Sequence, residues 1–206
     1  MPKKQKLLSS EEFFDILRLR TPGNASRSDA LINSRSGAEM AVLVCDSSGF
    51  SKKTHDHGII EFLDTMVKCH DRFVRIVENV GGQALSSKAD NLIALFPSVE
   101  TAARAALELN AWLKARNAKV PPYKRYNICS GIDFGSLIRL TDDAYGPTVN
   151  VAFKVGEDVA GIDEILLTDR AAARLDGSFR KRYARNVTIG ALSFDLYRLL
   201  PRSSRR

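Results

Sequence analysis

The sequence predicts an α+β fold in which one antiparallel sheet packs two helices on one face. Two observations lead to this prediction. Short apolar runs typical of strands and two long amphipathic helical patterns follow one another in the order strand, helix, strand, strand, helix, strand. The length of 206 residues also suits one domain of ordinary size. This order is that of the split βαβ or ferredoxin-like arrangement, with further strands and a helix added toward the C-terminus.

The first 38 residues differ from the rest and are expected to form a helix and a linker. Residues 9–19 carry apolar side chains at helical spacing. The stretch 20–37 is rich in Ser, Arg, Asn and Gly, which is typical of a loop. We therefore place the main domain at residues 39–200, followed by a short basic tail at 201–206.

The main domain is expected to contain strands and helices in alternation along both of its halves. Its first half is expected to hold a buried strand, a long helix, a hairpin and a second helix, at 39–46, 57–82, 81–96 and 98–117. Its second half is expected to hold two strands separated by a Gly-rich break, a helix, a strand, a small helix and two final strands, at 126–140, 146–160, 164–168, 169–175, 185–189 and 193–199. The two long helices cover one face of the sheet, so the other face needs a cover such as a partner chain.

The net charge of +7 favours anionic partners. Much of this charge lies near the two ends of the chain and in the cluster at 180–185. The sequence contains no basic stripe interleaved with aromatic residues and no DNA-binding motif, so nucleic acid is not the expected partner. A phosphorylated small molecule would use the same positive charge, and a solvated basic surface is the plain alternative.

The sequence carries no sign of export or of membrane insertion. No apolar run approaches the roughly 18 residues needed to cross a bilayer, and the N-terminus lacks the apolar core of a signal peptide. Cys45, Cys69 and Cys129 lie within apolar patterns without CxxC spacing, which favours buried thiols over disulfides or a zinc site. We expect a cytoplasmic protein with no membrane partner.

Two carboxylates stand at positions that the predicted topology brings together. Asp46 ends the first strand, and Asp90 opens the second strand of the central hairpin. Side by side they would repel each other unless a cation lay between them. Their hard oxygen atoms suit Mg²⁺ or Mn²⁺, and two such ions can serve both the attacking and the leaving oxygen of a phosphoryl transfer. The alternative is that each aspartate merely caps a turn.

Small residues follow Asp46 directly, ahead of a helical pattern. The backbone N–H groups of such a segment, together with a helix N-terminus, can hold a triphosphate. The candidate substrate-binding residues here are Ser47, Ser48, Gly49, Phe50 and Ser51.

Three segments, in this order, resemble the class III nucleotidyl cyclases, the family of adenylate and guanylate cyclases. "VLVCDSSGFS" is similar to the family's strand that ends in Asp-x-x-Gly-Phe, and "GGQALSSKADNLIALF" to its Gly-Gly and Ala-Asp hairpin. "DAYGPTVNVAFK" is similar to its Asp-x-x-Gly-x-x-Val-Asn-x-Ala-x-Arg segment. The resemblance runs from about Met40 to Thr168.

This resemblance implies a reaction and roles for particular residues. Asp46 and Asp90 match the two metal carboxylates, Asn150 the residue that orients the ribose and the transition state, and Asp143 a position that reads the base. In the family these sets come from opposite protomers of a head-to-tail homodimer. The ribose 3′-hydroxyl attacks the α-phosphate of a nucleoside triphosphate, which gives a 3′,5′-cyclic nucleotide and pyrophosphate.

The sequence departs from the family pattern at two positions. Ser86 stands where the family has its purine-reading Lys or Glu, and Lys88 does not replace it, because a shift of two residues moves a side chain by roughly 6–7 Å along a strand. Lys154 stands at the place of the transition-state Arg. Lysine keeps the positive charge but lacks the bidentate fork of arginine.

These departures leave three functions open. In the first, Ser86 and Asp143 read a pyrimidine, so that UTP or CTP becomes cyclic UMP or cyclic CMP, as in the Pycsar antiphage systems that the chain resembles in type and layout. In the second, the protein is an adenylate cyclase that uses ATP through a divergent pocket. In the third, it is a cyclase-like nucleotide-binding or regulatory module that has lost turnover.

Overall fold

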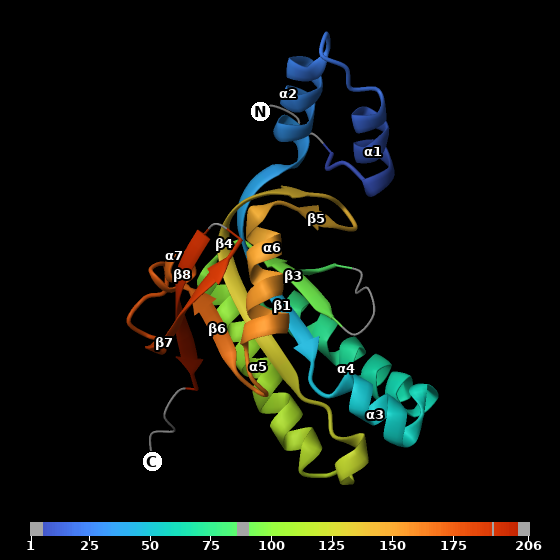
Figure 1. Ribbon diagram of the computed structural model, residues 1–206, viewed down its shortest axis with the longest axis vertical. Coiled ribbons are helices and arrows are strands. Elements are labelled where there is room, and N and C mark those ends of the chain that lie inside the picture. The colour runs from blue at the N-terminus through green and yellow to red at the C-terminus, as the bar shows by residue number, and fades with distance from the viewer. Residues whose placement is uncertain (1–5, 86–90, 191, 202–206) are drawn as a thin grey trace.

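The computed structural model describes residues 6–85, 91–190 and 192–201 of the chain (Figure 1). Its centre is a sheet of eight strands in the order β2-β3-β1-β4-β6-β8-β7, with β5 paired to β4 beside this path. The strands are β1 (Gly37–Ser47), β2 (Gln83–Ala84), β3 (Leu92–Phe96), β4 (Ile128–Arg139), β5 (Ala144–Tyr145), β6 (Ile165–Thr168), β7 (Arg180–Ile189) and β8 (Leu192–Leu200). Most neighbours are antiparallel, whereas β4 and β6 are parallel.

Helices lie on both faces of this sheet (Figure 1). The α-helices of the main part are α3 (Phe50–His57), α4 (Ile59–Asn79), α5 (Val99–Asn117), α6 (Pro147–Lys154) and α7 (Asp169–Ala172). A 3₁₀ turn at Pro122–Lys124 precedes β4, and a π-helical turn at Val155–Val159 follows α6. The predicted order of strand, helix, two strands, helix and strand is confirmed by β1, α4, β2, β3, α5 and β4. Among the described residues, no helix is both long and apolar enough to cross a membrane.

The central strand β1 is buried on both sides because its alternate residues enter two different cores. Ala41, Leu43 and Cys45 pack with apolar side chains of α4 and α5. Val42 and Val44 point the other way and pack in the core that also contains residues of α6. α6 of the same chain therefore supplies part of the cover that this second face was expected to need.

Three local predictions differ from the structure. The long helix expected at 57–82 is confirmed as α4, but a separate helix, α3, precedes it and was not expected; Gly58 at φ 85°, a backbone region that favours glycine, separates the two. The expected break within 126–140 is absent, and β4 runs through it as one strand. The expected loop at 20–37 contains the helix α2 (Ala25–Ser36), which pairs with α1 (Ser10–Arg18). The remaining elements lie near their predicted places.

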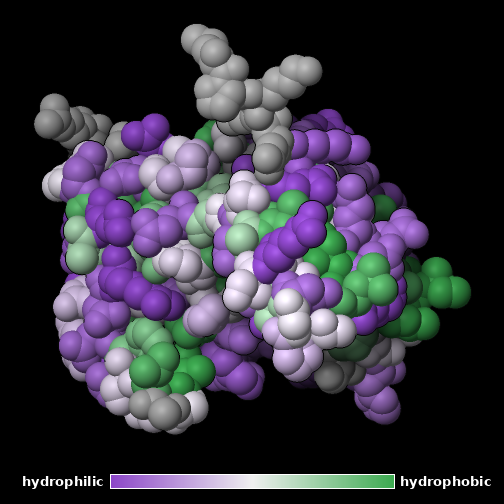
Figure 2. All heavy atoms as spheres, turned by 90° about the horizontal axis from the view of Figure 1, so that it is seen from above, coloured by the Kyte–Doolittle hydropathy of each residue, from purple (hydrophilic) through white to green (hydrophobic). Residues whose placement is uncertain are grey.

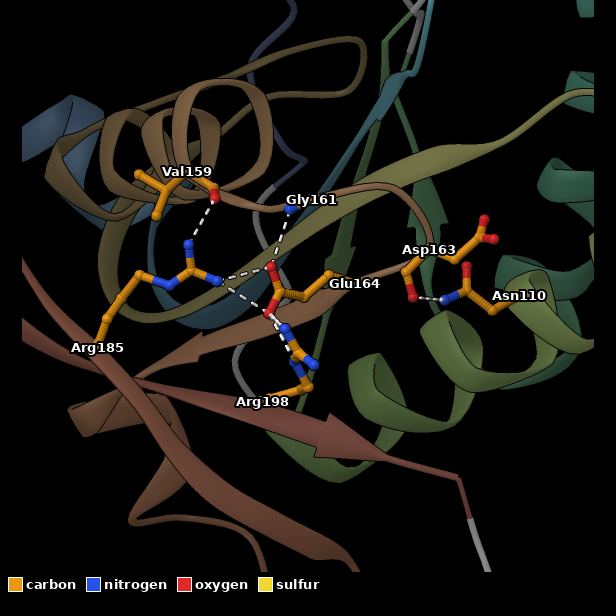
Figure 3. Close-up of polar contacts among 7 residues, drawn as sticks. All are labelled: Asn110, Val159, Gly161, Asp163, Glu164, Arg185 and Arg198. Atoms are coloured by element: carbon orange, nitrogen blue, oxygen red, sulfur yellow. Dashed lines mark hydrogen bonds and ion pairs between the residues drawn. The ribbon is translucent and has the colours of Figure 1, made fainter.

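A buried glutamate fastens the C-terminal hairpin to the rest of the sheet (Figure 3). Glu164 lies just before β6, and its side chain is 5% exposed. The carboxylate accepts hydrogen bonds from Arg198 Nε at 2.6 Å and from Arg185 Nη2 at 2.9 and 3.0 Å. The N–H of Gly161 donates a further hydrogen bond of 2.9 Å. Burial by itself would raise the pKa of Glu164, but these hydrogen bonds and the two positive charges bring that pKa below its usual value.

Candidate active site

Asp46 lies one residue before the end of β1, beside β4. Asp46 is half-buried, and in the strand register it pairs with Cys129 of β4. The pKa of the Cys129 thiol is raised to about 11, first by burial and then by the charges of Asp46, Asp163 and Glu164. Asp46 therefore places a negative charge beside Cys129, and a cation near Asp46 would offset that charge.

The segment after Asp46 turns sharply into α3. The N–H of Ser48 donates to the carbonyl of Asn127 at 2.9 Å, which holds the turn against the chain that leads into β4. Gly49 adopts φ 82°, a left-handed conformation that glycine takes at little cost, and α3 begins at the next residue. The first N–H groups of a helix have no acceptor within it, so the N-terminus of α3 is a candidate anion site.

Three further residues of this segment, Ser47, Phe50 and Ser51, belong to β1 or to α3. Ser47 is buried at the end of β1. The ring of Phe50 packs edge to face on Phe62 of α4, with ring centroids 4.9 Å apart, so Phe50 anchors the start of α3 to the core. The backbone of Ser51 lies in the first turn of α3, and its side chain falls outside the described part of the structure.

Asp90 and Ser86 lie outside the described residues, but the chain on either side of them is placed. Leu92, at the start of β3, pairs with Cys45, so the strand that follows Asp90 begins beside the end of β1 that carries Asp46. Asn91 Nδ2 donates to Glu157 Oε1 at 2.5 Å, which ties the start of β3 to the π-helical turn. No sequence pattern pointed to the Asn91–Glu157 contact.

Asn150 and Lys154 lie one helical turn apart on the exposed side of α6. Both side chains therefore face away from the core that α6 forms with β1. Lys154 Nζ is 2.7 Å from Asp158 Oδ2, and its hydrogen bond to this carboxylate raises the pKa of the lysine. Lys154 thus carries its full positive charge at neutral pH.

Asp143 lies in the turn between β4 and β5, far from Asp46 along the same pair of strands. Antiparallel pairing sets Ile138 opposite Gly37 at one end of the β1–β4 ladder and Cys129 opposite Asp46 at the other. The nine steps from Gly37 to Asp46 correspond to roughly 30 Å of strand. One chain therefore does not bring Asp143 and Asp46 to the same nucleotide.

Tyr145 is a residue of this region that the sequence analysis missed. Its hydroxyl donates to Asp143 Oδ2 at 2.8 Å, while the N–H of Ala144 donates to Asp143 Oδ1 at 2.8 Å. The spacing of two residues between Asp143 and Tyr145 was the only available signal, and it is shared by any strand that follows a turn.

The residues present fit a hard divalent cation in chemistry, although the described residues alone do not complete a site. Within the described ranges, no group of three or more His, Cys, Asp or Glu side chains is placed to hold a metal ion. Asp46 supplies a carboxylate of the type that Mg²⁺ and Mn²⁺ prefer. Its charge is close enough to Cys129 to raise the pKa of that thiol. The second carboxylate assigned to such an ion, Asp90, lies outside the described residues.

The fold matches solved structures, although no family model and no curated protein matches the sequence. The adenylyl cyclase CyaB from P. aeruginosa aligns with a TM-score of 0.70 and 16% identity over 82% of this chain and 96% of its own. The guanylate cyclase domain of RhGC from Catenaria anguillulae, in complex with GTP, aligns with 0.68 and 15% over 82% and 98%. A non-canonical dimeric guanylyl cyclase domain of the RhoGC fusion protein from Blastocladiella emersonii aligns with a TM-score of 0.68 and 16% identity over 80% of this chain and 97% of its own. The chain therefore has the fold of the class III adenylyl and guanylyl cyclase catalytic domains.

Proposed function

We propose that this protein is a nucleotidyl cyclase that converts a nucleoside triphosphate into a 3′,5′-cyclic nucleotide and pyrophosphate. The observation that carries the proposal is the combination of the cyclase fold with the family's motif residues at defined places on it. Asp46 lies at the end of β1 before the N-terminus of α3, and Asn150 and Lys154 lie together on the exposed side of α6. An unrelated function would not require this set of residues.

The active site is proposed to form between two copies of the chain. Asp143 and Asp46 lie at opposite ends of the β1–β4 ladder, a separation that one nucleotide cannot span. A head-to-tail homodimer would bring Asp46 of one chain to Asp143, Asn150 and Lys154 of the other. Two equivalent sites then follow from the two-fold symmetry. One of the similar structures is a guanylyl cyclase domain in a non-canonical dimer, which supports association of two copies but not this particular orientation.

Each group has a part in the proposed reaction. The first N–H groups of α3 bind the triphosphate, and Asp46 with Asp90 would hold two Mg²⁺ or Mn²⁺ ions. When bound, these ions supply Lewis-acid chemistry that makes the ribose 3′-hydroxyl more acidic and neutralises phosphate charge. Asn150 orients the ribose so that its 3′-oxygen lies in line with the α-phosphorus.

The bond changes are those of an internal phosphoryl transfer. The 3′-oxygen forms a bond to the α-phosphorus, the bond from that phosphorus to the bridging oxygen of the β-phosphate breaks, and the hydroxyl proton passes to water. Pyrophosphate leaves. Lys154 stabilises the negative charge that develops on the phosphate oxygens, with one ammonium group in place of the guanidinium fork.

The base is proposed to be a pyrimidine. Ser86 replaces the Lys or Glu with which the family reads purines, whereas Asp143 remains. A site that reads a base by hydrogen bonds rejects a base whose partner is missing, so UTP or CTP is favoured and ATP is the second candidate. The product, cyclic UMP or cyclic CMP, would then serve as a second messenger in antiphage defence. Turnover is favoured over a purely regulatory role because Asp46, Asp90 and Asn150 are all retained.

One assay tests both the reaction and the base. The purified protein is incubated with Mn²⁺ and each of ATP, GTP, CTP and UTP, and the products are separated by chromatography. We expect one dominant cyclic pyrimidine nucleotide together with equimolar pyrophosphate. Cyclic AMP as the sole product would remove the pyrimidine assignment and keep the cyclase. Nucleotide binding without any product would support the regulatory module instead.

A further inference from the structure

The turn that carries Asp143 is held by the segment that precedes the main domain. The N–H of Thr141 donates to the carbonyl of Leu8 at 3.0 Å. The N–H of Ser10, at the start of α1, donates to Asp142 Oδ1 at 2.9 Å. Two neighbours of Asp143 are therefore fastened to residues that lie more than 130 positions earlier in the chain.

An aromatic stack extends this contact to Asp143 itself. The ring of Phe13 in α1 is buried and stacks on the ring of Tyr145, with centroids 5.7 Å apart and an interplanar angle of 15°. Phe14 approaches the same ring edge-on at 5.8 Å. Because the hydroxyl of Tyr145 donates to Asp143 Oδ2, a direct line of contacts runs from α1 to the carboxylate.

The N-terminal helix pair, α1 and α2, is held together by an ion pair between α2 and the turn that precedes it and by a small apolar core. Arg20 and Asp29 form a bidentate ion pair with both N–O distances at 2.8 Å. Leu8, Phe13 and Ile32 share a small core with Leu140 of the β4–β5 turn. Figure 2 looks down on the end of the molecule from which this pair projects in Figure 1, and its surface is mostly hydrophilic with separate apolar patches.

The two hydrogen bonds on Asp143 fix the plane of its carboxylate. One oxygen accepts from the N–H of Ala144 and the other from Tyr145. An ionised carboxylate accepts hydrogen bonds only, through about four lone-pair directions. These two hydrogen bonds set how the carboxylate is turned, and therefore how it would meet a hydrogen-bond donor on the edge of a base.

We infer that Tyr145 is a positioning residue for base selection and that the N-terminal helix pair supports it through Phe13. This inference rests on the proposed function, since it assigns the structural basis of base selection at the same site. In this arrangement the segment before the catalytic fold sets how strictly the enzyme chooses its nucleotide, without itself touching the nucleotide.

The first test is Tyr145→Phe, which keeps the ring and its stack but removes the hydroxyl. The measurement is kcat/KM for each of the four nucleoside triphosphates with Mn²⁺, together with the melting temperature. We expect the preference for the best base over the next to fall about tenfold, because one hydrogen bond to a charged group is lost. The matched control is Tyr183→Phe on β7, whose ring contacts Tyr197, and it should leave the preference unchanged.

A purely structural role for Tyr145 gives a different pattern. Loss of folded protein lowers kcat/KM for all four nucleotides alike and does not change their ratio. In addition, Tyr145→Phe should have no further effect on the ratio in an Asp143→Ala background, because the two residues act as one unit. Independent effects of the two changes would contradict the inference.

The helix pair is tested by Phe13→Ala, with Leu19→Ala as its control. Leu19 caps the same helix and is 73% exposed, so its removal should change nothing. Phe13→Ala should lower the base preference in the same direction as Tyr145→Phe.

Where the wild type selects one base and Tyr145→Phe selects it as strongly, the inference is wrong and the cyclase proposal stands. Where the wild type neither binds nor converts any of the four nucleotides, the proposed function itself fails, and the inference with it.

Discussion

Gly131 of β4 and Gly156 of the π-helical turn approach each other so closely that a Cβ on Gly131 would lie 2.5 Å from the nitrogen of Gly156. The same Cβ would lie 2.5 Å from the carbonyl oxygen of Ala152 in α6. The absence of a side chain at Gly131 therefore lets α6, which carries Asn150, lie directly on the sheet.

The change Gly131→Ala should destabilise the protein and lower its activity. Overpacking of a tight contact costs about 1–3 kcal/mol, and the shift of α6 would displace Asn150 and Lys154. Chemical denaturation and a cyclase assay measure the two effects. Gly177→Ala is the matched control, since a Cβ at Gly177 meets nothing within 4 Å. Equal stability and activity of both variants would contradict the packing role of Gly131.

The strand and helix order was predictable because the apolar patterns of β1, α4, β3 and α5 are long and regular. Two glycines made one strand prediction wrong. Gly131 and Gly135 suggested a break in β4, but they serve the close approach of α6 and of Thr148. The short helix α3, which ends at Gly58, was missed because its residues are mostly polar and show no apolar periodicity.

The N-terminal region and part of the site required the structure. Helix α2 is polar, so it lacks the apolar periodicity that reveals a helix. The positions of Asp46 and Asn150 followed from the motifs. The contact of Tyr145 with Phe13 did not, because it joins segments that are distant in the sequence. The contact of Tyr145 with Asp143 did not either, because a spacing of two residues is common to any strand that follows a turn.

The buried Glu164 should make stability depend on pH. Its pKa in the folded protein is lowered below the usual value of 4.5, so its contribution is present above that value and is lost as the pH falls through the folded pKa. Glu164→Gln should cost about 2 kcal/mol of unfolding free energy at pH 7, because two arginines lose their carboxylate.

Urea denaturation of wild type and variant from pH 7 down to pH 3 measures this effect. The difference between the two proteins should shrink toward the acid end, where the wild-type carboxylate becomes protonated. Glu108→Gln, at an exposed position of α5, is the control and should show no such trend. A difference that stayed constant with pH would show that the Glu164 charge contributes nothing to stability.

Lys154 should be required for turnover but not for folding. Lys154→Ala should lower kcat about a hundredfold through loss of charge stabilisation in the transition state, whereas Lys154→Arg should retain or raise it because the guanidinium offers two donors. The control is Lys68→Ala, which removes an equally exposed i,i+4 partner of an aspartate on α4. Full activity of Lys154→Ala in steady-state kinetics would remove Lys154 from the mechanism.

The metal assignment predicts loss of activity without loss of fold. Asp46→Asn and Asp90→Asn should each lower turnover at least about a hundredfold while the circular dichroism spectrum stays that of the wild type. EDTA should abolish wild-type activity, and added Mn²⁺ should restore it. Asp71→Asn, on the exposed side of α4, should behave as the wild type. Turnover that survived in both site variants would refute the assignment.

The most direct test of the shared cyclase site is to mix two inactive variants, Asp46→Asn and Asn150→Ala. In a head-to-tail dimer, a mixed pair holds one site with both defects and one site with neither. If subunits exchange at random, half of the dimers are mixed and each has one intact site, so about a quarter of wild-type activity should return. Recovery to this level, with neither variant active alone, is the predicted result. A mixture in which native mass spectrometry detects mixed dimers but no cyclic nucleotide forms would contradict it.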